Sequence, residues 1–341
     1  MDPLSHVLLG AATGQAIGGG RRRIAALAGA AGALLPDADV LIASGTDPLL
    51  ALEYHRQFTH SIVAAPVGAV IVAALLWMLM RRRVEPARLY WPALVGYLSH
   101  IFLDACTSYG TQLLWPFTDT RFAASIVAVI DPLITLVLLV GVVLAFRSSA
   151  ARPARVAVGI VVMYLSVGWI QRERAETLVA SAAAQRKHVI TQHEVKPTLG
   201  NVLLWRSVYQ HGNDYFIDAA RVGFSAPVLY TGGSIRRIQP IDLVPPLNVN
   251  SVQAADLVRF ARVSDGFLAR HPAVPSVIGD VRYSMLPNST EPLWGIEVHA
   301  EREQEHVGFR TFRDFSKDDR QRFFAMLRGV APDAILGRSP K

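Results

Sequence analysis

Long apolar runs, separated by short polar connections, fill the first half of this 341-residue chain. The clearest run covers residues 62–80 and contains no charged side chain. As a helix it would measure roughly 28 Å, about the hydrocarbon thickness of a bilayer. Similar runs cover residues 123–146 and 154–170, and a shorter uncharged run covers residues 89–103. This pattern predicts membrane-crossing helices.

Two weaker segments open the chain, at residues 4–20 and 24–35. Both are rich in Gly and Ala, which suits close packing between helices better than a lipid-facing surface. If each of the six segments crosses once, the connections alternate between the two sides of a membrane. Fewer crossings follow if the two opening segments are re-entrant or buried helices.

Beyond residue 171 the long apolar runs stop and the apolar period shortens to that of strands. Strands are predicted at residues 202–209, 215–222, 281–285 and 293–299. Helices are predicted at residues 252–270, where apolar side chains recur at helical spacing, and after Ser316, because Asp319 three positions later resembles a capping box. Gly232, Gly233 and Ser234 are predicted to form a turn.

The predicted fold is therefore an all-α polytopic membrane helical domain followed by a soluble α+β domain. The membrane-embedded domain covers residues 1–171. The soluble domain covers residues 172–341 and starts with a charged helical connector.

Composition supports a membrane protein, because 51% of the residues are hydrophobic, 18% are charged and the mean hydropathy is +0.30. The net charge of +7 alone would also fit a nucleic-acid partner. However, the arginines of the first half lie in clusters between the apolar runs: Arg21 to Arg23, Arg81 to Arg83 with Arg88, and Arg147, Arg152 and Arg155. Such clusters mark the cytoplasmic side of a multi-pass protein. The expected partner is the lipid bilayer and not a nucleic acid.

The opposite ends of the same segments carry the rarer polar side chains, and this side is expected to be the outer face, together with the second domain. The set consists of four imidazoles and three carboxylates: His6, Asp37, Asp39, His55, His60, His100 and Asp104. His100 and Asp104 are four residues apart, so one helix face would present both to a shared ion. His55 and His60 are five apart and need a turn between them to face one cavity.

These residue types predict a metal centre. A single cysteine, Cys106, excludes a cysteine-rich zinc site. Imidazoles mixed with carboxylates fit zinc best, with manganese or iron as alternatives, and seven donors are enough for two ions. Metal-activated water would then support hydrolysis. The alternatives are structural: His6 or Asp39 as helix caps, and Asp104 as an ion-pair partner of Arg56.

Two further residues are candidates for catalysis. Arg56 could hold a substrate phosphate or transition-state charge, although an outward-facing arginine at a helix end is the commoner reason for such a residue. Asp131 could be a ligand or a proton relay, or it could satisfy backbone groups freed by Pro132. In the second half, Glu297, His299, Glu301 and His306 could bind an ion, but so charged a run favours a solvated strand or loop.

The motif segments resemble those of the YdjM-like inner-membrane metal-dependent hydrolases over about the first 170 residues. They are residues 2–6, Pro36-Asp37-Ala38-Asp39, residues 55–61 and residues 96–104. The resemblance implies a bacterial cytoplasmic-membrane protein with hydrolase activity. More distantly, the His and Asp pattern is similar to zinc-dependent phospholipase C and the related zinc nucleases, although His100 is followed at the fourth position by Asp where those enzymes commonly have Glu.

The leading hypothesis is a membrane-bound metal-dependent hydrolase acting on a phosphoester or lipid-linked substrate. The alternatives are a metal-ion transporter or sensor, and a non-catalytic membrane scaffold. A transporter predicts ligands near the bilayer midplane and a polar path to the arginine side.

Overall fold

The computed structural model describes residues 1–81, 83–223, 225–243 and 247–332, and these residues form two compact units. The first, called here the bundle unit, comprises Met1–Ile42, Tyr54–Ile170 and Leu199–Asn201. The second, the sheet unit, comprises Ala43–Glu53, Gln171–Thr198 and Val202–Lys341. The short segment Ala43–Glu53 thus belongs to the sheet unit although it interrupts the first part of the chain.

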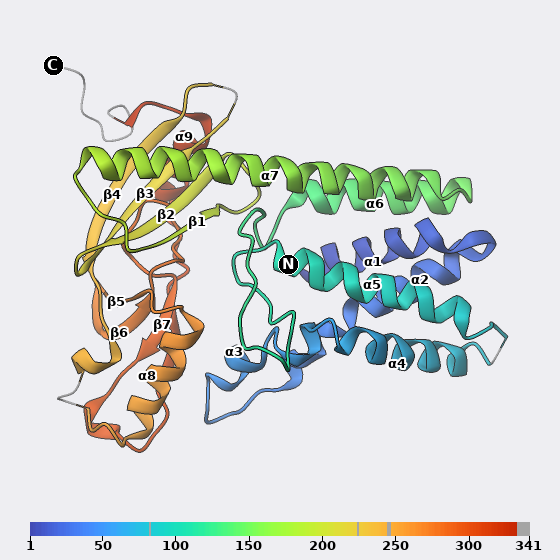
Figure 1. The fold of residues 1–341 in the computed structure, drawn as a ribbon, viewed down its shortest axis with the longest axis horizontal. Helices are drawn as coiled ribbons and strands as arrows, with labels where there is room; N and C mark the ends of the chain where they lie inside the picture. Colours follow the sequence, from blue (N-terminus) through green and yellow to red (C-terminus); the bar gives the residue numbers. More distant parts are fainter. Residues whose placement is uncertain (82, 224, 244–246, 333–341) are drawn as a thin grey trace. The chain divides into compact units, whose positions relative to one another are not determined.

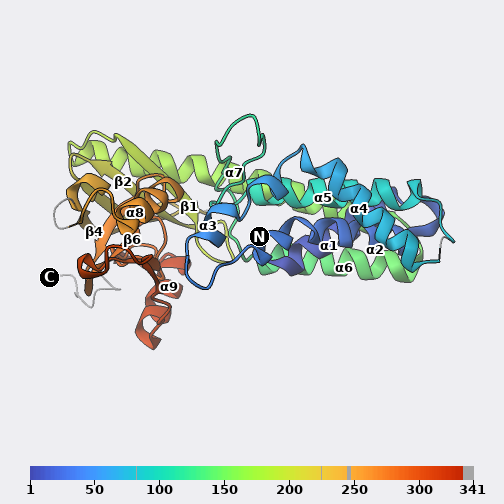
Figure 2. The same cartoon turned by 90° about the horizontal axis from the view of Figure 1, so that it is seen from below.

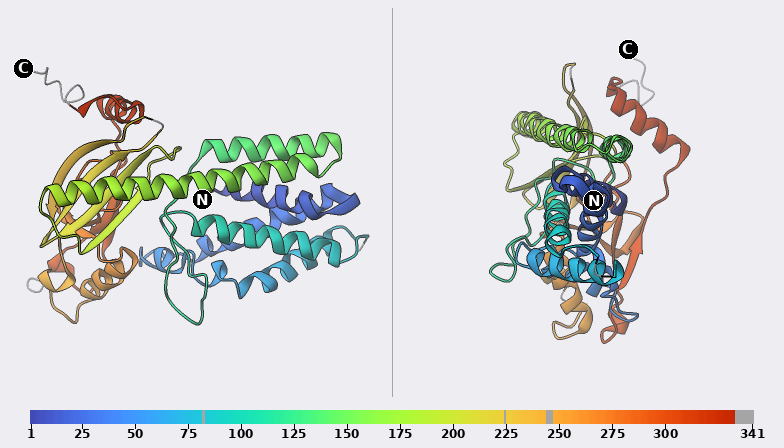
Figure 3. Two further views of the ribbon diagram at one scale, coloured as in Figure 1. Left: turned by 45° about the horizontal axis from the view of Figure 1, so that its top comes forward. Right: turned by 90° about the vertical axis from the view of Figure 1, so that its right-hand side faces the viewer.

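The bundle unit is helical (Figure 1). Its elements, in chain order, are α1 (Pro3–Ile17), η1 (Gly19–Arg21), α2 (Arg22–Leu34), η2 (Pro36–Leu41), η3 (Phe58–His60), α4 (Ala64–Leu79), α5 (Ala87–Ala105), α6 (Pro132–Ser148) and the first part of α7 (Arg152–Gln185). Within the short helix α3 (Leu50–Tyr54), the chain passes from residues of the second unit to residues of the first. The turns α1–α2, α4–α5 and α6–α7 all lie at one end of the bundle, which the right view of Figure 3 faces.

These three turns carry the arginine clusters of the sequence. The described arginines at or beside the turns include Arg21, Arg22, Arg81, Arg147 and Arg152, whereas Arg82 lies outside the described residues. The predicted histidines and aspartates lie toward the other end, at the start of α1, in η2 and η3, and in the last turns of α5. The two sets are therefore separated along the bundle axis.

Glycines bring the helices α1, α2 and α5 close together; Figure 2 shows the bundle from below. A Cβ atom at Gly29 of α2 would collide with the carbonyl group of Gly10 in α1, and one at Gly96 of α5 would collide with the carbonyl group of Gly29. Only glycine permits such an approach between backbones. This contact holds α1 and α5 against α2, and all three helices supply groups to the candidate site.

The predicted polytopic fold is wrong. Among the described residues, one helix, α7, is long and apolar enough to cross a membrane, or two if the bent pair Leu50–His60 and Ala64–Leu79 counts as one broken span. Helices α1, α2 and α4 have 15, 13 and 16 residues, whereas a span needs about 20. The runs at residues 62–80 and 123–146 are thus longer than the helices α4 and α6 that they form.

Helix α6 shows the physical reason for such a difference. The run at residues 123–146 predicts a helix from its first residue, but the helix begins at Pro132. Asp131 caps it by accepting hydrogen bonds from the backbone N–H groups of Leu133 and Ile134 at 3.0 and 3.3 Å. An Asp cap followed by Pro fixes a helix start more strongly than apolar composition extends it. Residues 123–130 instead run without helical structure.

The sheet unit contains two four-stranded antiparallel sheets (Figure 3, left). The first has the order β1-β2-β3-β4 and the second β5-β6-β7-β8. Their bounds are β1 (Gln192–Pro197), β2 (Leu204–His211), β3 (Asp214–Arg221), β4 (Val228–Arg236), β5 (Leu268–His271), β6 (Val274–Asp280), β7 (Trp294–Glu297) and β8 (Gly308–Thr311). Helices α8 (Val252–Val263) and α9 (Lys317–Arg328) and the short η4 (Pro240–Leu243) and η5 (Ala300–Arg302) complete it.

Several predicted elements of this unit are corrected. The helix predicted at residues 252–270 ends at Val263, after which Gly266 takes a positive φ of 74° and β5 begins. Gly232 and Gly233 lie inside β4 and not in a turn. Position 232 requires glycine because the strand passes so close to the backbone of Asn288 that no Cβ fits there. Residues 281–285 follow β6 instead of forming a strand. The predicted capping box is confirmed at Ser316 and Asp319.

Segment Ala43–Glu53 is anchored in the sheet unit by burial and charge. Leu49 is 1% exposed and belongs to a core cluster with Leu257 and Phe260 of α8. Arg259 of α8 donates to Asp47 and Glu53 at 2.9 and 2.8 Å. The bundle and sheet units are therefore interleaved along the chain.

Candidate metal centre

Four side chains of the bundle unit converge on one point. They are Asp37 from η2, His60 from η3, and His100 and Asp104 from the end of α5, each with a donor atom within 4.8 Å of the others. The two histidines and Asp104 are fully buried, whereas the side chain of Asp37 is 18% exposed. The cluster therefore has one side that solvent can reach.

The distances between the donor atoms match the edges of a tetrahedron. His60 Nε2 and His100 Nε2 are 3.0 Å apart. Asp104 Oδ2 lies 3.3 and 3.4 Å from them, and Asp37 Oδ1 lies 3.7 and 3.6 Å from them. Four ligands at about 2.0–2.2 Å from a zinc ion would be separated by about 3.3–3.6 Å. The residues present fit a four-coordinate metal ion.

The hydrogen bonds behind the two histidines explain why this arrangement calls for a cation. His100 Nδ1 is 2.6 Å from the carbonyl oxygen of Ala33, so it carries the ring proton. The hydroxyl of Thr59 donates to Asp39, and it accepts from His60 Nδ1 at 3.0 Å. Both Nε2 lone pairs then face each other and two carboxylates. Only a shared proton or a metal cation makes this arrangement favourable.

Asp104 is divided between two roles. Its Oδ1 atom pairs with Arg56 at 3.0 Å and with His6 Nε2 at 3.1 Å, and the α-amino group of Met1 contacts the same oxygen. Its Oδ2 atom is buried and has no hydrogen-bond donor among the described residues. The ion pair between Arg56 and Asp104, one of the structural alternatives from the sequence, is therefore present. It uses Oδ1 of Asp104, so that Oδ2 is directed at His60 and His100.

A second group of donors adjoins the first. Asp37, Asp39 and His55 have donor atoms within 4.8 Å of one another, and Asp37 belongs to both groups. His55 Nδ1 lies 3.0 Å from Asp39 Oδ1. Burial alone would raise the pKa of Asp39, but hydrogen bonds from His55, His60 and the backbone N–H of Arg56 hold it well below the usual value. Asp39 therefore stays ionised and orients both histidines.

An unusual backbone conformation brings His55 and His60 to the same place. Arg56, between them, has a φ of 63°, which is rare for a residue with a side chain. This turn puts the two imidazole rings 5.8 Å apart, edge to face. His55 and His60 therefore reach the same site although they are five residues apart in the sequence.

His6 lines the centre but is not one of the four converging donors. Its ring stacks on that of His100 with centroids 3.6 Å apart, and its Nδ1 atom is buried without a partner among the described residues. It supports the orientation of His100 and binds the Arg56 side of Asp104.

Arg56 lies at the centre, and Asp131 lies elsewhere in the bundle. The Arg56 side chain is 5% exposed and donates to Thr107 as well as pairing with Asp104. Asp131 caps α6 and accepts from the hydroxyl of Tyr164 at 2.8 Å. None of the described contacts of Asp131 involves the histidine cluster.

Several groups of the centre had no signal in the residue pattern. The carbonyl oxygen of Ala33 is a backbone atom, and the hydroxyl of Thr59 acts only through its hydrogen bonds to Asp39 and His60. Arg121 donates to the carbonyl oxygen of His55 at 3.3 Å, and its guanidinium carbon lies 5.6 Å from the centroid of the Tyr109 ring, which Arg56 approaches at 5.1 Å. Arg121 comes from a segment that the sequence assigned to the connection between helices.

A third donor group lies in the sheet unit. Asp47, Asp256 and His306 have donor atoms within 4.8 Å of one another. Here Arg259 already donates to both carboxylates, at 2.9 Å to Asp47 and 2.7 Å to Asp256, and His306 binds Asp256 at 2.9 Å. These contacts describe an ion-pair network that needs no metal.

Comparison with known proteins places the bundle unit in a family. The chain is 30% identical over 142 residues to the uncharacterized protein YfhP of Bacillus subtilis (strain 168), covering 39% of this chain and 43% of that protein. It is 41% identical over 102 residues to the inner membrane protein YbcI of Escherichia coli (strain K12), covering 27% of this chain and 53% of that protein. The chain thus spans about half the length of these relatives. No solved structure matches it.

The model of one family, described as the YdjM inner membrane protein, matches residues 1–175. This region contains all the donors of the candidate metal centre. The match covers more than half of the chain and agrees with the resemblance carried by the histidine and aspartate motifs. The chain belongs to the YdjM inner membrane protein family.

Proposed function

We propose that this inner membrane protein is a metal-dependent hydrolase that acts on a phosphoester, with a lipid-linked phosphoester as the favoured substrate. The observation that carries the proposal is the convergence of His60, His100, Asp37 and Asp104 at tetrahedral separations around two facing lone pairs. Imidazole and carboxylate donors in this geometry favour zinc over manganese or iron.

The residues that would hold the metal follow from the two donor groups. Asp37, His60, His100 and Asp104 would hold one ion, and Asp37, Asp39 and His55 could hold a second. A bound ion would supply Lewis-acid activation of water and of a phosphoryl oxygen. Because Asp37 and His55 are 18% and 29% exposed, they lie on the side from which a substrate can approach.

Two arginines support a phosphoester rather than an uncharged ester. Arg56 and Arg121 both approach the ring of Tyr109, and that ring lies 5.8 Å from the ring of His55. Guanidinium groups match the planar, multi-oxygen geometry of a phosphoryl group. We infer that Arg56 and Arg121 orient the substrate and stabilise negative charge on it while its phosphoester bond is cleaved.

The position of the donors favours hydrolysis over transport. His6 is in the first turn of α1, and His100 and Asp104 are in the last turns of α5. A transporter would hold its ion near the middle of the helices, with a polar path leading onward. Donors at the ends of helices suit a centre that meets its substrate at the membrane surface.

The orientation of α7 is the remaining part of the proposal. Arg152 and Arg155 lie at its N-terminal end, with Arg147 shortly before it. Arginines beside a span favour the cytoplasmic side. We infer that α7 begins on the cytoplasmic side, so its other end and the metal centre at that end of the bundle unit face outward.

The direct test measures bound metal and turnover in the purified full chain. Wild-type protein is expected to contain at least one zinc ion per chain by elemental mass spectrometry and to cleave an anionic phosphodiester. His100→Ala and Asp104→Asn are expected to lose most of the metal and all turnover, while His188→Ala, which changes a histidine of the sheet unit, keeps both. Metal-free wild-type protein, or full turnover by Asp104→Asn, would overturn the proposal.

A further inference from the structure

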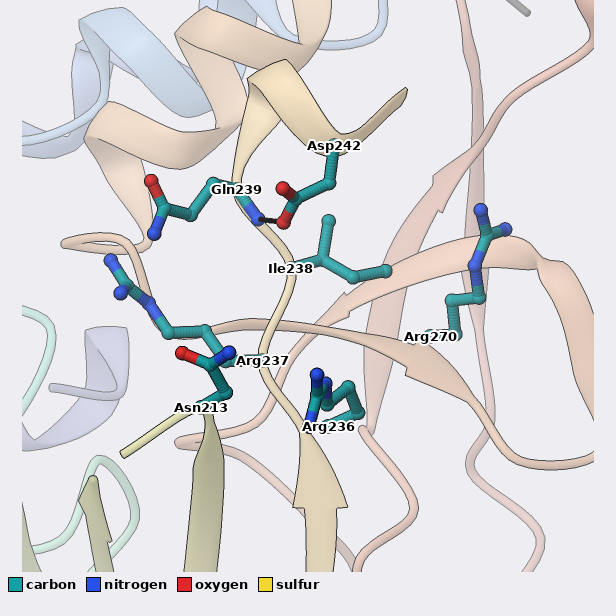
Figure 4. A pocket seen from close by; sticks show the side chains of 7 residues that line it. All are labelled: Asn213, Arg236, Arg237, Ile238, Gln239, Asp242 and Arg270. Atoms are coloured by element: carbon teal, nitrogen blue, oxygen red, sulfur yellow. Dashed lines mark hydrogen bonds between the residues drawn. The ribbon is translucent and has the colours of Figure 1, made fainter. Parts of the chain in front are cut away.

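A cavity of about 290 Å³ in the sheet unit is lined by arginines and amides (Figure 4). Arg236 ends β4, Arg237 and Gln239 follow it, Asn213 lies in the β2–β3 turn, and Arg270 is in β5. Figure 4 shows Arg237 and Gln239 extending to one side of the chain segment, with Ile238 and Arg270 on the other. Residues far apart in sequence thus meet around one space.

The charge of this lining is not balanced by the nearby carboxylates. Asp242 is the acidic residue of the lining, and its Oδ2 atom already accepts the backbone N–H of Gln239 at 2.7 Å. Asp214 lies 3.7 Å from Arg236, but both side chains are largely in solvent, at 42% and 71% exposure. An exposed pair of this kind is weak because water screens it. The three guanidinium groups therefore keep an excess of positive charge.

The arginines also keep unused hydrogen-bond donors. A guanidinium group has five N–H donors. Arg270 uses one on the carbonyl oxygen of Pro275, at 2.8 Å, and Arg237 bonds the side chain of Tyr215. The Nε atom of Arg237 is buried without an acceptor among the described residues. A buried donor without an acceptor is costly, so an oxygen-rich ligand would be favoured here.

We propose that this cavity binds a phosphate-bearing anion. Its volume is at the lower end of the roughly 300–1,000 Å³ of small-ligand sites, which suits a head group or a small phosphoryl compound. Several arginines with amide side chains form the donor set that recognises a phosphoryl group with two or more oxygens. The site shares no residue with the candidate metal centre, so it is a binding site independent of hydrolysis.

The same chemistry could come from an anionic phospholipid or from a soluble phosphoryl compound, and two binding assays separate these sources. In the first, pyrophosphate is titrated into the detergent-solubilised full chain at about 0.15 M salt and followed by calorimetry. In the second, the protein is mixed with nanodiscs of phosphatidylglycerol or phosphatidylcholine. Arg237→Gln and Arg270→Gln are compared with Arg262→Gln, which removes an exposed arginine of α8 outside the cavity.

Loss of a guanidinium contact is expected to weaken binding about tenfold for Arg237→Gln and Arg270→Gln, with Arg262→Gln close to wild type. Loss in the pyrophosphate assay identifies a soluble ligand, and loss confined to phosphatidylglycerol identifies a lipid head group. Because Arg270 is exposed, its substitution tests binding without endangering the fold. Equal binding by all three variants, or no binding in either assay, would overturn the inference. The metal centre is unchanged in every variant, so neither result depends on hydrolysis.

Discussion

At the scale of single residues, the four-residue donor group of Asp37, His60, His100 and Asp104 is oriented by groups outside it. Asp39 and the carbonyl oxygen of Ala33 hold the Nδ1 sides of His60 and His100, so that both Nε2 atoms face the same point. Such partners fix the tautomer and the ring orientation of a ligand. Both imidazoles therefore direct an Nε2 atom toward the point where the proposed metal ion would bind.

Asp39→Asn tests this positioning. The substitution keeps the shape of the side chain but weakens its hold on His55, His60 and the backbone of Arg56. Zinc affinity, measured by competition with a chelator, is expected to fall about 10- to 100-fold without being abolished. Asp37→Asn removes a donor of both groups and should reduce affinity further. If Asp39→Asn bound zinc as tightly as wild type, Asp39 would have no positioning role.

Arg56 makes a separate prediction about catalysis. Arg56→Gln removes the charge that faces the substrate side of Tyr109, but it leaves all the donor atoms of the two metal groups. Turnover is expected to fall by about 10²–10³, while the zinc content stays near that of wild type. Arg56→Lys should recover part of the activity because it restores the charge without the planar fork. Loss of zinc in step with activity would show instead that Arg56 acts only by holding Asp104.

At the scale of elements, helix contacts decide where the donors lie. The close approach of α1, α2 and α5 at Gly10, Gly29 and Gly96 brings His6 onto His100 and brings Ala33 to His100 Nδ1. Apolar composition alone does not specify this approach. It depends on which glycines face one another when the helices cross.

Gly29→Ala tests the helix contact. Its methyl group would meet the backbone of Gly10, so thermal unfolding should show a loss of about 1–3 kcal/mol. Gly159→Ala is the matched control, because a Cβ there meets nothing within 4 Å and alanine favours a helix by up to about 1 kcal/mol. The control should be as stable as wild type or more so. Equal effects of the two substitutions would rule out the close contact.

The anchor of segment Ala43–Glu53 predicts a dependence on pH. Partial burial alone would raise the pKa of Asp47, but hydrogen bonds from Arg259 and the backbone of Leu49 lower it below its usual value. A lowered pKa contributes stability that is present above about pH 4 and is lost as the pH falls further. Arg259→Gln should lower the melting temperature at pH 7 and weaken its fall between about pH 5 and pH 3. Arg262→Gln, by contrast, should keep the wild-type acid profile.

At the scale of the whole molecule, the chain is an inner membrane protein whose one clearly span-length helix among the described residues is α7. Its orientation can be measured by labelling, since the native chain has a single cysteine, Cys106, that is 5% exposed. Ser148→Cys is at the arginine-rich end and Ser181→Cys is near the other end of α7, and both serines are exposed. A membrane-impermeant thiol reagent should label Ser181→Cys in intact spheroplasts. Ser148→Cys should react only after permeabilisation, and the reverse result would invert the proposed orientation.

The sequence by itself determined the family, the separation of arginines from histidines and aspartates, and the residue types of the candidate centre. These features depend on composition and short spacings, which local geometry preserves: His100 and Asp104, four apart on α5, do face one point. The sequence also predicts the start of a helix where a strong local capping signal is present, as the confirmed capping box at Ser316 shows.

Only the tertiary structure decided the length of the helices, the two antiparallel sheets and the detailed arrangement of the centre. The start of α6 follows from one capping aspartate inside an apolar run, and strands β6 and β7 pair although residues 281–293 separate them in the chain. Likewise, Asp131 and Asp104 each follow a short apolar stretch of the sequence. Asp131 nevertheless caps a helix, whereas Asp104 faces two histidines. The physical reason is that capping, close glycine contacts and ion pairs depend on which segments meet in space, and hydrophobicity along the chain does not fix that.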